Sequence, residues 1–225
     1  MHDVTVVFDL DGTLADTSPD LTGALQAVLA GMGLPPVDAA FARPLAGRGA
    51  RVMIGTALQA LGEAPPGPEE MQRHIADFIE YYRAHIAVGS RAFPGCEAEL
   101  TRLTARGARL AVCTNKREEL AVLLLNELGL IRHFQAVLGG DSLAVCKPDP
   151  AHVLGAITAA GGSPSRAVMV GDSIADVTAA QAAGVPVIAV SFGFSDVPAG
   201  MLSADLVIHH YGQLHGAVEA LLRGS

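Results

Sequence analysis

The chain has 225 residues, and half of them are apolar, so it can form one or two domains with a substantial hydrophobic core. Its formal net charge of -8 excludes a generally basic surface, and we therefore expect no nucleic-acid and no membrane partner. The three cysteines, Cys96, Cys113 and Cys146, show no CxxC spacing, which argues against both a disulfide framework and a zinc site.

The sequence carries no signal for export or membrane insertion. No cationic region precedes the first apolar run, and no apolar stretch approaches the roughly 18 residues needed to cross a bilayer. We expect a cytoplasmic protein whose thiols stay reduced. The sequence leaves open whether it is a monomer or a homodimer.

The first predicted element is an apolar strand over residues 4–8, which ends at two aspartates, Asp9 and Asp11. Gly12 and Thr13 then turn the chain. Because alternate side chains of a strand share a face, Asp9 and Asp11 can point into one pocket while Leu10 packs on the other side. Two buried acids are costly unless a cation joins them, so this strand end is the first candidate site.

A helical insert is predicted to follow. Apolar residues at helical spacing predict helices over residues 19–32, 48–61 and 70–87, with Ser18 as the N-cap of the first. We expect no strand between Leu14 and Ser90. Residues 15–89 are therefore an insert of about the size of a small helical bundle.

From residue 93 onward, helices and strands alternate. The sequence predicts strands over residues 109–113, 136–138, 167–170, 185–190 and 205–208, and helices over residues 94–106, 117–128, 150–160, 174–183 and 214–222. This alternation predicts an α/β fold with a doubly wound parallel sheet. Its first strand precedes the insert, so we expect a discontinuous core domain, residues 1–14 and 90–225.

Three of the predicted strands end in residues that can perform chemistry. Asp9 and Asp11 follow the first strand, Thr114 and Asn115 follow strand 109–113, and Asp172 follows strand 167–170. In open α/β sheets the carboxyl ends of the strands line the ligand crevice, so these residues can form one site. Taken singly, each of these residues is also common in turns or at helix starts, where it needs no catalytic role.

The acids favour a magnesium site. Asp9, Asp11 and Asp172 offer only oxygen ligands, which suit Mg²⁺ better than zinc. Asp176 lies one turn into the next predicted helix, where a carboxylate fits two roles: it can face the same metal, or it can complement the helix dipole.

A metal beside a carboxylate indicates phosphoryl chemistry. The carboxylate can attack as a nucleophile and form an aspartyl-phosphate, which splits one displacement into two. The charge on the attacked phosphoryl group then needs compensating donors, which Thr114, Lys147 and the backbone N–H groups of the Asp9 loop can supply. For Lys147, which lies in the segment CKPDP, a solvated surface lysine is the alternative interpretation.

Four motifs occur in an order that resembles the haloacid dehalogenase (HAD) superfamily, and within it the phosphoglycolate phosphatase branch. They are FDLDGTL (residues 8–14), CTNK (residues 113–116), KPDP (residues 147–150) and GDSIAD (residues 171–176). The resemblance implies a HAD-like Rossmannoid core, with the insert 15–89 as an α-helical cap domain that closes over the substrate.

The resemblance also implies separate roles for the acids. Asp9 would be the nucleophile, and Asp11 the general acid and base. Asp9, the backbone carbonyl of Asp11 and Asp172 would hold Mg²⁺, while Asp176 would order its water shell.

The same resemblance implies roles for the groups that bind the phosphate. Thr114 and the Asn115 amide would bind the transferring phosphoryl group, and Lys147 would neutralise it beside Asp9. The substrate would be a small phosphorylated metabolite.

We expect an Mg²⁺-dependent phosphomonoester hydrolase, with 2-phosphoglycolate as the leading substrate. Asp11 favours phosphoryl chemistry over dehalogenation, because the related dehalogenase branch lacks this second acid. Three alternatives stay open. They are a phosphatase for a sugar phosphate, nucleotide or pyrophosphate, a phosphomutase resembling β-phosphoglucomutase, and a silent module that binds a phosphorylated ligand.

The choice of substrate depends on the insert. The sequence departs from the phosphoglycolate phosphatase pattern at Arg48 and Arg51, which are more basic than usual there, and at Asp149, where histidine is common. Our hypothesis is that Arg48 reaches the carboxylate of the leaving group, since a guanidinium suits bidentate carboxylate binding. A solvated arginine at a helix start is the alternative.

Overall fold

The computed structural model describes residues 1–195 and 197–223 and divides into two compact units. The first combines residues 1–16 with residues 91–225, and the second comprises residues 17–90. The role of the second unit as a cap over the substrate stays a prediction.

The first unit contains a six-stranded parallel sheet, in the order β5-β4-β1-β6-β7-β8. Its strands are β1 (Thr5–Phe8), β4 (Arg109–Cys113), β5 (Ala136–Leu138), β6 (Ala167–Gly171), β7 (Val187–Val190) and β8 (Leu206–Ile208). The central strands β1, β6 and β7 are buried along their whole length, which explains their continuous apolar sequences.

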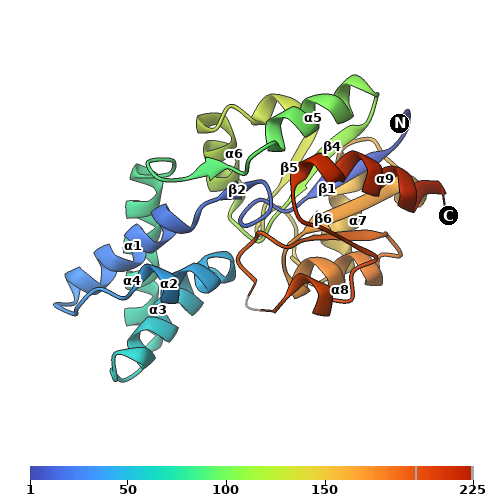
Figure 1. Ribbon diagram of the computed structural model, residues 1–225. Helices are drawn as coiled ribbons and strands as arrows, with labels where there is room; N and C mark the ends of the chain where they lie inside the picture. Colours follow the sequence, from blue (N-terminus) through green and yellow to red (C-terminus); the bar gives the residue numbers. More distant parts are fainter. Residues whose placement is uncertain (196, 224–225) are drawn as a thin grey trace. The chain divides into compact units, whose positions relative to one another are not determined.

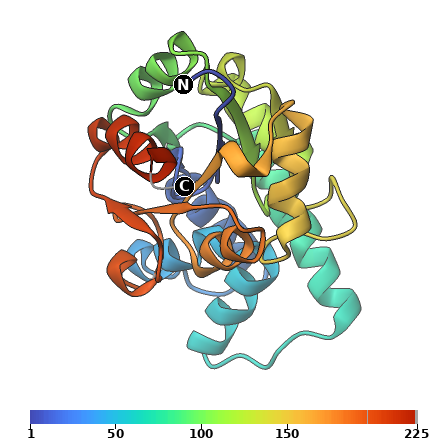
Figure 2. The same cartoon turned by 90° about the vertical axis from the view of Figure 1, so that its right-hand side faces the viewer.

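Helices cover both faces of this sheet. They are α5 (Cys96–Ala105), α6 (Glu118–Glu127), α7 (Pro150–Ala159), α8 (Ile174–Ala182) and α9 (Leu214–Arg223). Helix α5 packs beside α9 on one side of the strands and α7 packs beside α8 on the other, as Figure 1 shows and Figure 2 shows from the side. This arrangement confirms the predicted α/β, doubly wound sheet.

The main apolar core lies between the sheet and the pair α7 and α8. It joins Val7 of β1 and Met169 of β6 to Ile157 of α7 and Val177 of α8, all fully or almost fully buried. The core therefore fixes β1 against β6, and with them the loops that follow both strands.

Strand β1 lies where the sheet reverses its order. Phe8 pairs with Val112 of β4 on one side and with Val170 of β6 on the other. The loops that leave these three strands therefore start next to one another, at the topological switch point where α/β proteins bind ligands.

The second unit is helical. Its elements are α1 (Ser18–Gly31), α2 (Ala39–Ala42), a 3₁₀ helix (Arg43–Arg48), α3 (Ala50–Ala60) and α4 (Pro68–Ala84). Helix α4 packs against α1 and α3, and buries Phe78 and Tyr82. Asp20 ties the two ends of the unit together, since its carboxylate accepts the Gly89 N–H at 2.8 Å and the Ser90 N–H at 2.7 Å.

The structure corrects several predicted boundaries in this region. Thr17, not Ser18, occupies the N-cap position of α1. The predicted helix 48–61 begins only at Ala50, because Gly49 has a φ of 83° and cannot continue a helix from the preceding 3₁₀ turn. The predicted helix 70–87 begins earlier, at Pro68, since proline fits the first turn, where its missing N–H is not needed.

A short ladder was also missed. Strand β2 (Ala15–Asp16) pairs antiparallel with β3 (Arg91–Ala92), although no strand was expected directly after Leu14. Two residues are too few to show strand periodicity in the sequence. Within the described residues, no helix is long and apolar enough to cross a membrane.

Candidate active site

Asp9 occupies the first position beyond β1. Its backbone N–H continues the sheet by donating to the Val170 carbonyl at 2.9 Å, which fixes the residue against β6. Its Oδ1 atom accepts the N–H of Leu10 at 2.7 Å and lies 2.9 Å from Nζ of Lys147. Asp9 is therefore held in one orientation, with only 9% of the residue exposed.

Lys147 lies between two acids. Its Nζ atom is 2.9 Å from Oδ1 of Asp9 and 2.6 Å from Oδ1 of Asp176, and only 2% of its side chain is exposed. Burial by itself lowers the pKa of Lys147, but the carboxylates of Asp176 and Asp9 outweigh burial and raise that pKa above its ordinary value. Lys147 is a buried cation, not the solvated surface lysine of the alternative interpretation.

The backbone of Lys147 is held by a buried histidine. Its N–H donates to Nδ1 of His152 at 3.2 Å, and Nε2 of His152 lies 3.0 Å from the Gly139 carbonyl. Helix α7 places His152 here, and begins with Asp149 as N-cap and Pro150 in its first turn. Asp149, where the sequence departs from the phosphoglycolate phosphatase pattern, thus caps helix α7.

Asp172 follows β6 and is enclosed by backbone. Its Oδ2 atom accepts the N–H of Phe194 at 2.7 Å. A Cβ atom on Gly193 would lie 2.3 Å from Cβ of Asp172, and one on Gly12 would lie 2.3 Å from Oδ2. Only glycine at both positions lets the loops after β1 and β7 approach this carboxylate.

Asp176 lies in the first turn of α8, and its carboxylate also faces the acid cluster. Its Oδ2 atom accepts the N–H of Ser173 at 3.0 Å and the Ser173 hydroxyl at 2.6 Å, in a capping box that starts α8. Its Oδ1 atom accepts from Lys147 at 2.6 Å. The two oxygens of one buried carboxylate thus cap the helix and join the acid cluster.

Three carboxylates, those of Asp9, Asp172 and Asp176, bring one oxygen each within 4.8 Å of one another. Burial raises the pKa of Asp9 to about 6, with Lys147 opposing, and burial together with the neighbouring Asp176 and Asp9 raises the pKa of Asp172 to about 8. The cluster carries more negative charge than Lys147 neutralises. An oxygen-only set with surplus charge fits a hard divalent cation such as Mg²⁺.

The Asp11 side chain does not belong to this group of three. Its Oδ1 and Oδ2 atoms lie 2.8 and 2.9 Å from Nζ of Lys116, and both side chains are nearly buried. The two acids of the DLD segment therefore face different cations, Lys147 for Asp9 and Lys116 for Asp11.

Thr114 and Asn115 lie where β4 ends, next to these acids. The Thr114 side chain is almost fully buried, and its Oγ1 accepts the N–H of Lys116 at 3.2 Å. The Asn115 side-chain amide donates to the Lys147 carbonyl at 2.9 Å and so links the loops after β4 and β5. Arg48 and Arg51 belong to the helical unit, and both are exposed.

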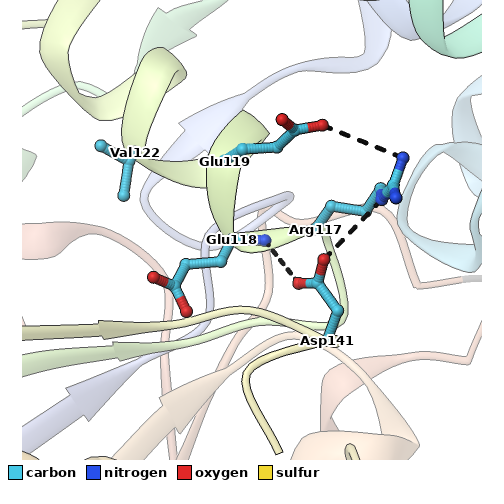
Figure 3. A pocket seen from close by; sticks show the side chains of 5 residues that line it. All are labelled: Arg117, Glu118, Glu119, Val122 and Asp141. Carbon is cyan, nitrogen blue, oxygen red and sulfur yellow. Dashed lines mark hydrogen bonds and ion pairs between the residues drawn. The ribbon is translucent and has the colours of Figure 1, made fainter.

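A separate pocket of about 670 Å³ opens beside this site, at the N-terminus of α6. Figure 3 shows its lining residues, Arg117, Glu118, Glu119, Val122 and Asp141. Arg117 is 3.9 Å from Glu119 and 3.7 Å from Asp141, while the Glu118 N–H donates to Asp141 at 2.8 Å. Arg117 thus pairs with Glu119 and Asp141 inside the pocket, while the Glu118 carboxylate accepts from the Ser142 hydroxyl.

Sequence reasoning missed three contributors to the site. It gave no role to Lys116, although this residue is the last of the CTNK motif and lies just past the end of β4. It also missed the Phe194 N–H, which donates to Asp172, and Gly193, which packs closely against Asp172. A glycine flanked by two phenylalanines directly after a strand was the available signal, since a buried strand end next to glycine indicates close backbone approach.

Comparisons with known proteins found a family model, sequence relatives and solved structures that match most of the chain. The family model of haloacid dehalogenase-like hydrolases matches residues 6–190. A phosphoglycolate phosphatase of Caulobacter vibrioides is 45% identical, over 99% of this chain and 94% of its own. One of Agrobacterium fabrum is 47% identical, over 94% of this chain and 91% of its own. The crystal structure of a predicted phosphoglycolate phosphatase from Haemophilus somnus 129PT superposes with a TM-score of 0.88 at 28% identity, over 96% of this chain and 97% of its own.

Proposed function

This chain belongs to the haloacid dehalogenase-like hydrolase family, and we propose that it is an Mg²⁺-dependent phosphomonoester hydrolase whose substrate is 2-phosphoglycolate. Membership confirms the resemblance inferred from the four motifs. The relatives named phosphoglycolate phosphatase, matched over nearly their whole length, support the choice of substrate.

The observation that carries the proposal is the position of Asp9. Its carboxylate is buried, and its Oδ1 atom is held by the Leu10 N–H and by Lys147. The same carboxylate lies next to those of Asp172 and Asp176. The Oδ2 atom of such a carboxylate can attack phosphorus, form an aspartyl-phosphate and expel the alcohol. The Lys147 ammonium, fixed by Asp176, then lies beside the charge that develops on the phosphoryl oxygens.

Asp11 transfers the protons in this scheme. In the first step its carboxyl group gives a proton to the oxygen of the leaving alcohol. In the second step its carboxylate takes a proton from water, which attacks the phosphorus and releases the Asp9 carboxylate together with inorganic phosphate. Thr114 lies at the adjoining strand end, where its hydroxyl can donate to a phosphoryl oxygen.

Asp9, Asp172 and the Asp11 carbonyl would hold Mg²⁺, with Asp176 ordering its water shell. When bound, the ion supplies positive charge that orients the phosphate and offsets its negative charge. The surplus negative charge of the cluster and its all-oxygen donor set support this part of the proposal. The free thiols Cys96, Cys113 and Cys146 support a reducing, cytoplasmic location.

Phosphate release from a panel of substrates tests the proposal. The panel contains 2-phosphoglycolate, a sugar phosphate, a nucleoside monophosphate and pyrophosphate, each with Mg²⁺ or with a chelator, and Asp9→Asn is the control. We expect Mg²⁺-dependent release that is fastest for 2-phosphoglycolate and absent in Asp9→Asn. Folded protein that releases phosphate from no substrate would overturn the proposal. Turnover only with an added sugar bisphosphate would identify a phosphomutase instead.

A further inference from the structure

Lys116 carries a nearly buried charge that the proposed reaction does not use. Its Nζ atom lies 2.8 Å from Oδ1 and 2.9 Å from Oδ2 of Asp11, with 6% of the Lys116 side chain and 10% of the Asp11 side chain exposed. We infer that Lys116 is a specificity-determining residue that binds a carboxylate on the leaving group of the substrate. This inference rests on the proposed function.

The backbone of Lys116 is rigidly placed. Its carbonyl accepts the Gly140 N–H at 2.8 Å, and its N–H donates to Thr114 at 3.2 Å. A Cβ atom on Gly139 would lie 2.7 Å from the Lys116 carbonyl oxygen, so the neighbouring loop is packed directly against it. The movable part of Lys116 is its four-carbon stem, which can swing the ammonium over a few ångströms without moving the site.

The ion pair with Asp11 must open during the reaction. Nζ contacts both oxygens of Asp11, yet one of these oxygens has to reach the oxygen of the leaving alcohol. An anionic group of the substrate can take the place of the Asp11 carboxylate beside this nearly buried ammonium. The exchange keeps a negative charge beside Lys116 when the substrate brings an anionic group close to the leaving oxygen.

The other acids of the cluster are poor replacements for Asp11. Asp9 and Asp176 already share Lys147, at 2.9 and 2.6 Å. A carboxylate one carbon from the ester oxygen, as in 2-phosphoglycolate, lies next to Asp11 whenever that oxygen does. Lys116 would then pass from the Asp11 carboxylate to the substrate carboxylate, and both Asp11 oxygens become available to the leaving group.

The next residue provides a matched control. The Arg117 side chain is about half exposed and turns toward Glu119 and Asp141 in the neighbouring pocket (Figure 3). Arg117→Met removes one positive charge at the adjacent position without touching Asp11. Arg48→Met tests the competing assignment of the carboxylate to the helical unit.

The experiment compares two substrates that differ in the carboxylate. For wild type, Lys116→Met, Lys116→Arg, Arg117→Met and Arg48→Met, kcat/KM is measured with 2-phosphoglycolate and with ethyl phosphate. We expect Lys116→Met to lower the ratio of the two kcat/KM values by roughly 10- to 100-fold, the loss of one charge-assisted contact. Lys116→Arg should restore part of the ratio, and Arg117→Met should leave it unchanged.

Product inhibition gives a readout that does not need 2-phosphoglycolate turnover. With p-nitrophenyl phosphate as the reporter substrate, the inhibition constant of glycolate should rise in Lys116→Met by about the same factor, while that of inorganic phosphate should change much less. Circular dichroism and a thermal melt check that the variant is folded.

Two results would overturn the inference. One is an equal loss on both substrates in Lys116→Met, which would mean that Lys116 acts on Asp11 alone. The other is that Lys116→Met leaves both the kcat/KM ratio and the inhibition constant of glycolate at their wild-type values. A change of these two quantities in Arg48→Met alone would have the same meaning. If the wild type fails to hydrolyse 2-phosphoglycolate, the proposed substrate is wrong, and the glycolate measurement still decides the role of Lys116.

Discussion

The ammonium of Lys147 lies 2.9 Å from Oδ1 of Asp9, with 2% of the lysine side chain exposed. This contact joins the loop that precedes α7 to the loop that follows the central strand β1. It gives the proposed nucleophile a fixed orientation and a buried positive charge beside the position of the phosphoryl group.

Replacing Lys147 by methionine tests that contact. The variant keeps the stem and removes the charge, so Asp9 and Asp176 lose their shared cation. We expect kcat to fall at least about 100-fold, as when one preorganised donor is lost, and the free energy of unfolding to fall by about 3–5 kcal/mol. Steady-state kinetics and urea unfolding measure both effects. A Lys147→Met variant with wild-type kcat would refute the role of this lysine.

Asp172→Asn tests the metal site. Burial and the neighbouring acids raise the pKa of Asp172 to about 8, so replacing it with a neutral amide relieves repulsion in the cluster. We expect the metal-free variant to melt at a higher temperature than the metal-free wild type. Mg²⁺ at about 100 times its Kd should stabilise the wild type by about 2.7 kcal/mol and the variant far less. Equal Mg²⁺ stabilisation of the two proteins would contradict the assignment.

Gly193→Ala tests the enclosure of Asp172. The added Cβ would lie 2.3 Å from Cβ of Asp172, so the loop after β7 has to move away. We expect a loss of about 1–3 kcal/mol of stability and a higher Mg²⁺ concentration for half-maximal activity. Gly216→Ala in α9 is the control, because its Cβ meets nothing within 4 Å and alanine favours the helix by about 0.5–1 kcal/mol.

The pH dependence of stability reports on His152. Burial and the charge of Lys147 lower the pKa of His152 below its ordinary value of 6.5. As the pH falls below 6.5, the unfolded chain binds a proton that the folded chain does not, so the free energy of unfolding falls. This loss of stability is at most about 1.4 kcal/mol per pH unit, and it stops once the pH is below the pKa of His152 in the folded protein.

His152→Asn isolates this contribution. The amide oxygen can replace Nδ1 as the acceptor of the Lys147 N–H, but the side chain does not titrate. Urea unfolding at pH 7.5, 6.5 and 5.5 should show a smaller decline of stability in the variant than in the wild type. Parallel declines in the two proteins would mean that His152 contributes nothing to the pH dependence.

The sequence predicted the strands of the six-stranded sheet and the residues at their ends, but not the β2–β3 ladder. Strand β4 lies at the predicted residues, since an apolar run between turn signals specifies a buried strand well. The short, partly buried strand β5 also lies where it was predicted. The acids of Asp9 and Asp172 meet because parallel strands bring their carboxyl ends to one edge, a rule of topology that needs no side-chain detail.

Long-range packing decided what the sequence could not predict. Lys116 and Arg117 are adjacent cations, and nothing in their local sequence shows which one faces Asp11. Distant residues pack against this turn: Gly139 lies against Lys116 and Glu118, and the Gly140 N–H donates to the Lys116 carbonyl. Likewise, the sequence left Asp176 between a metal site and the helix dipole, and it did not predict that one oxygen accepts from Lys147 while the other accepts from Ser173.

The central claim, that Asp9 is the nucleophile of a phosphatase, is tested most directly by trapping the phosphorylated enzyme. Asp11→Asn should slow the second step, while p-nitrophenyl phosphate, whose leaving group needs no proton, still allows the first. After an acid quench, mass spectrometry should find one phosphoryl group on the peptide that contains Asp9, and none when Asp9→Asn is added. A phosphoryl group on another residue, or turnover by the Asp9→Asn enzyme, would contradict the account.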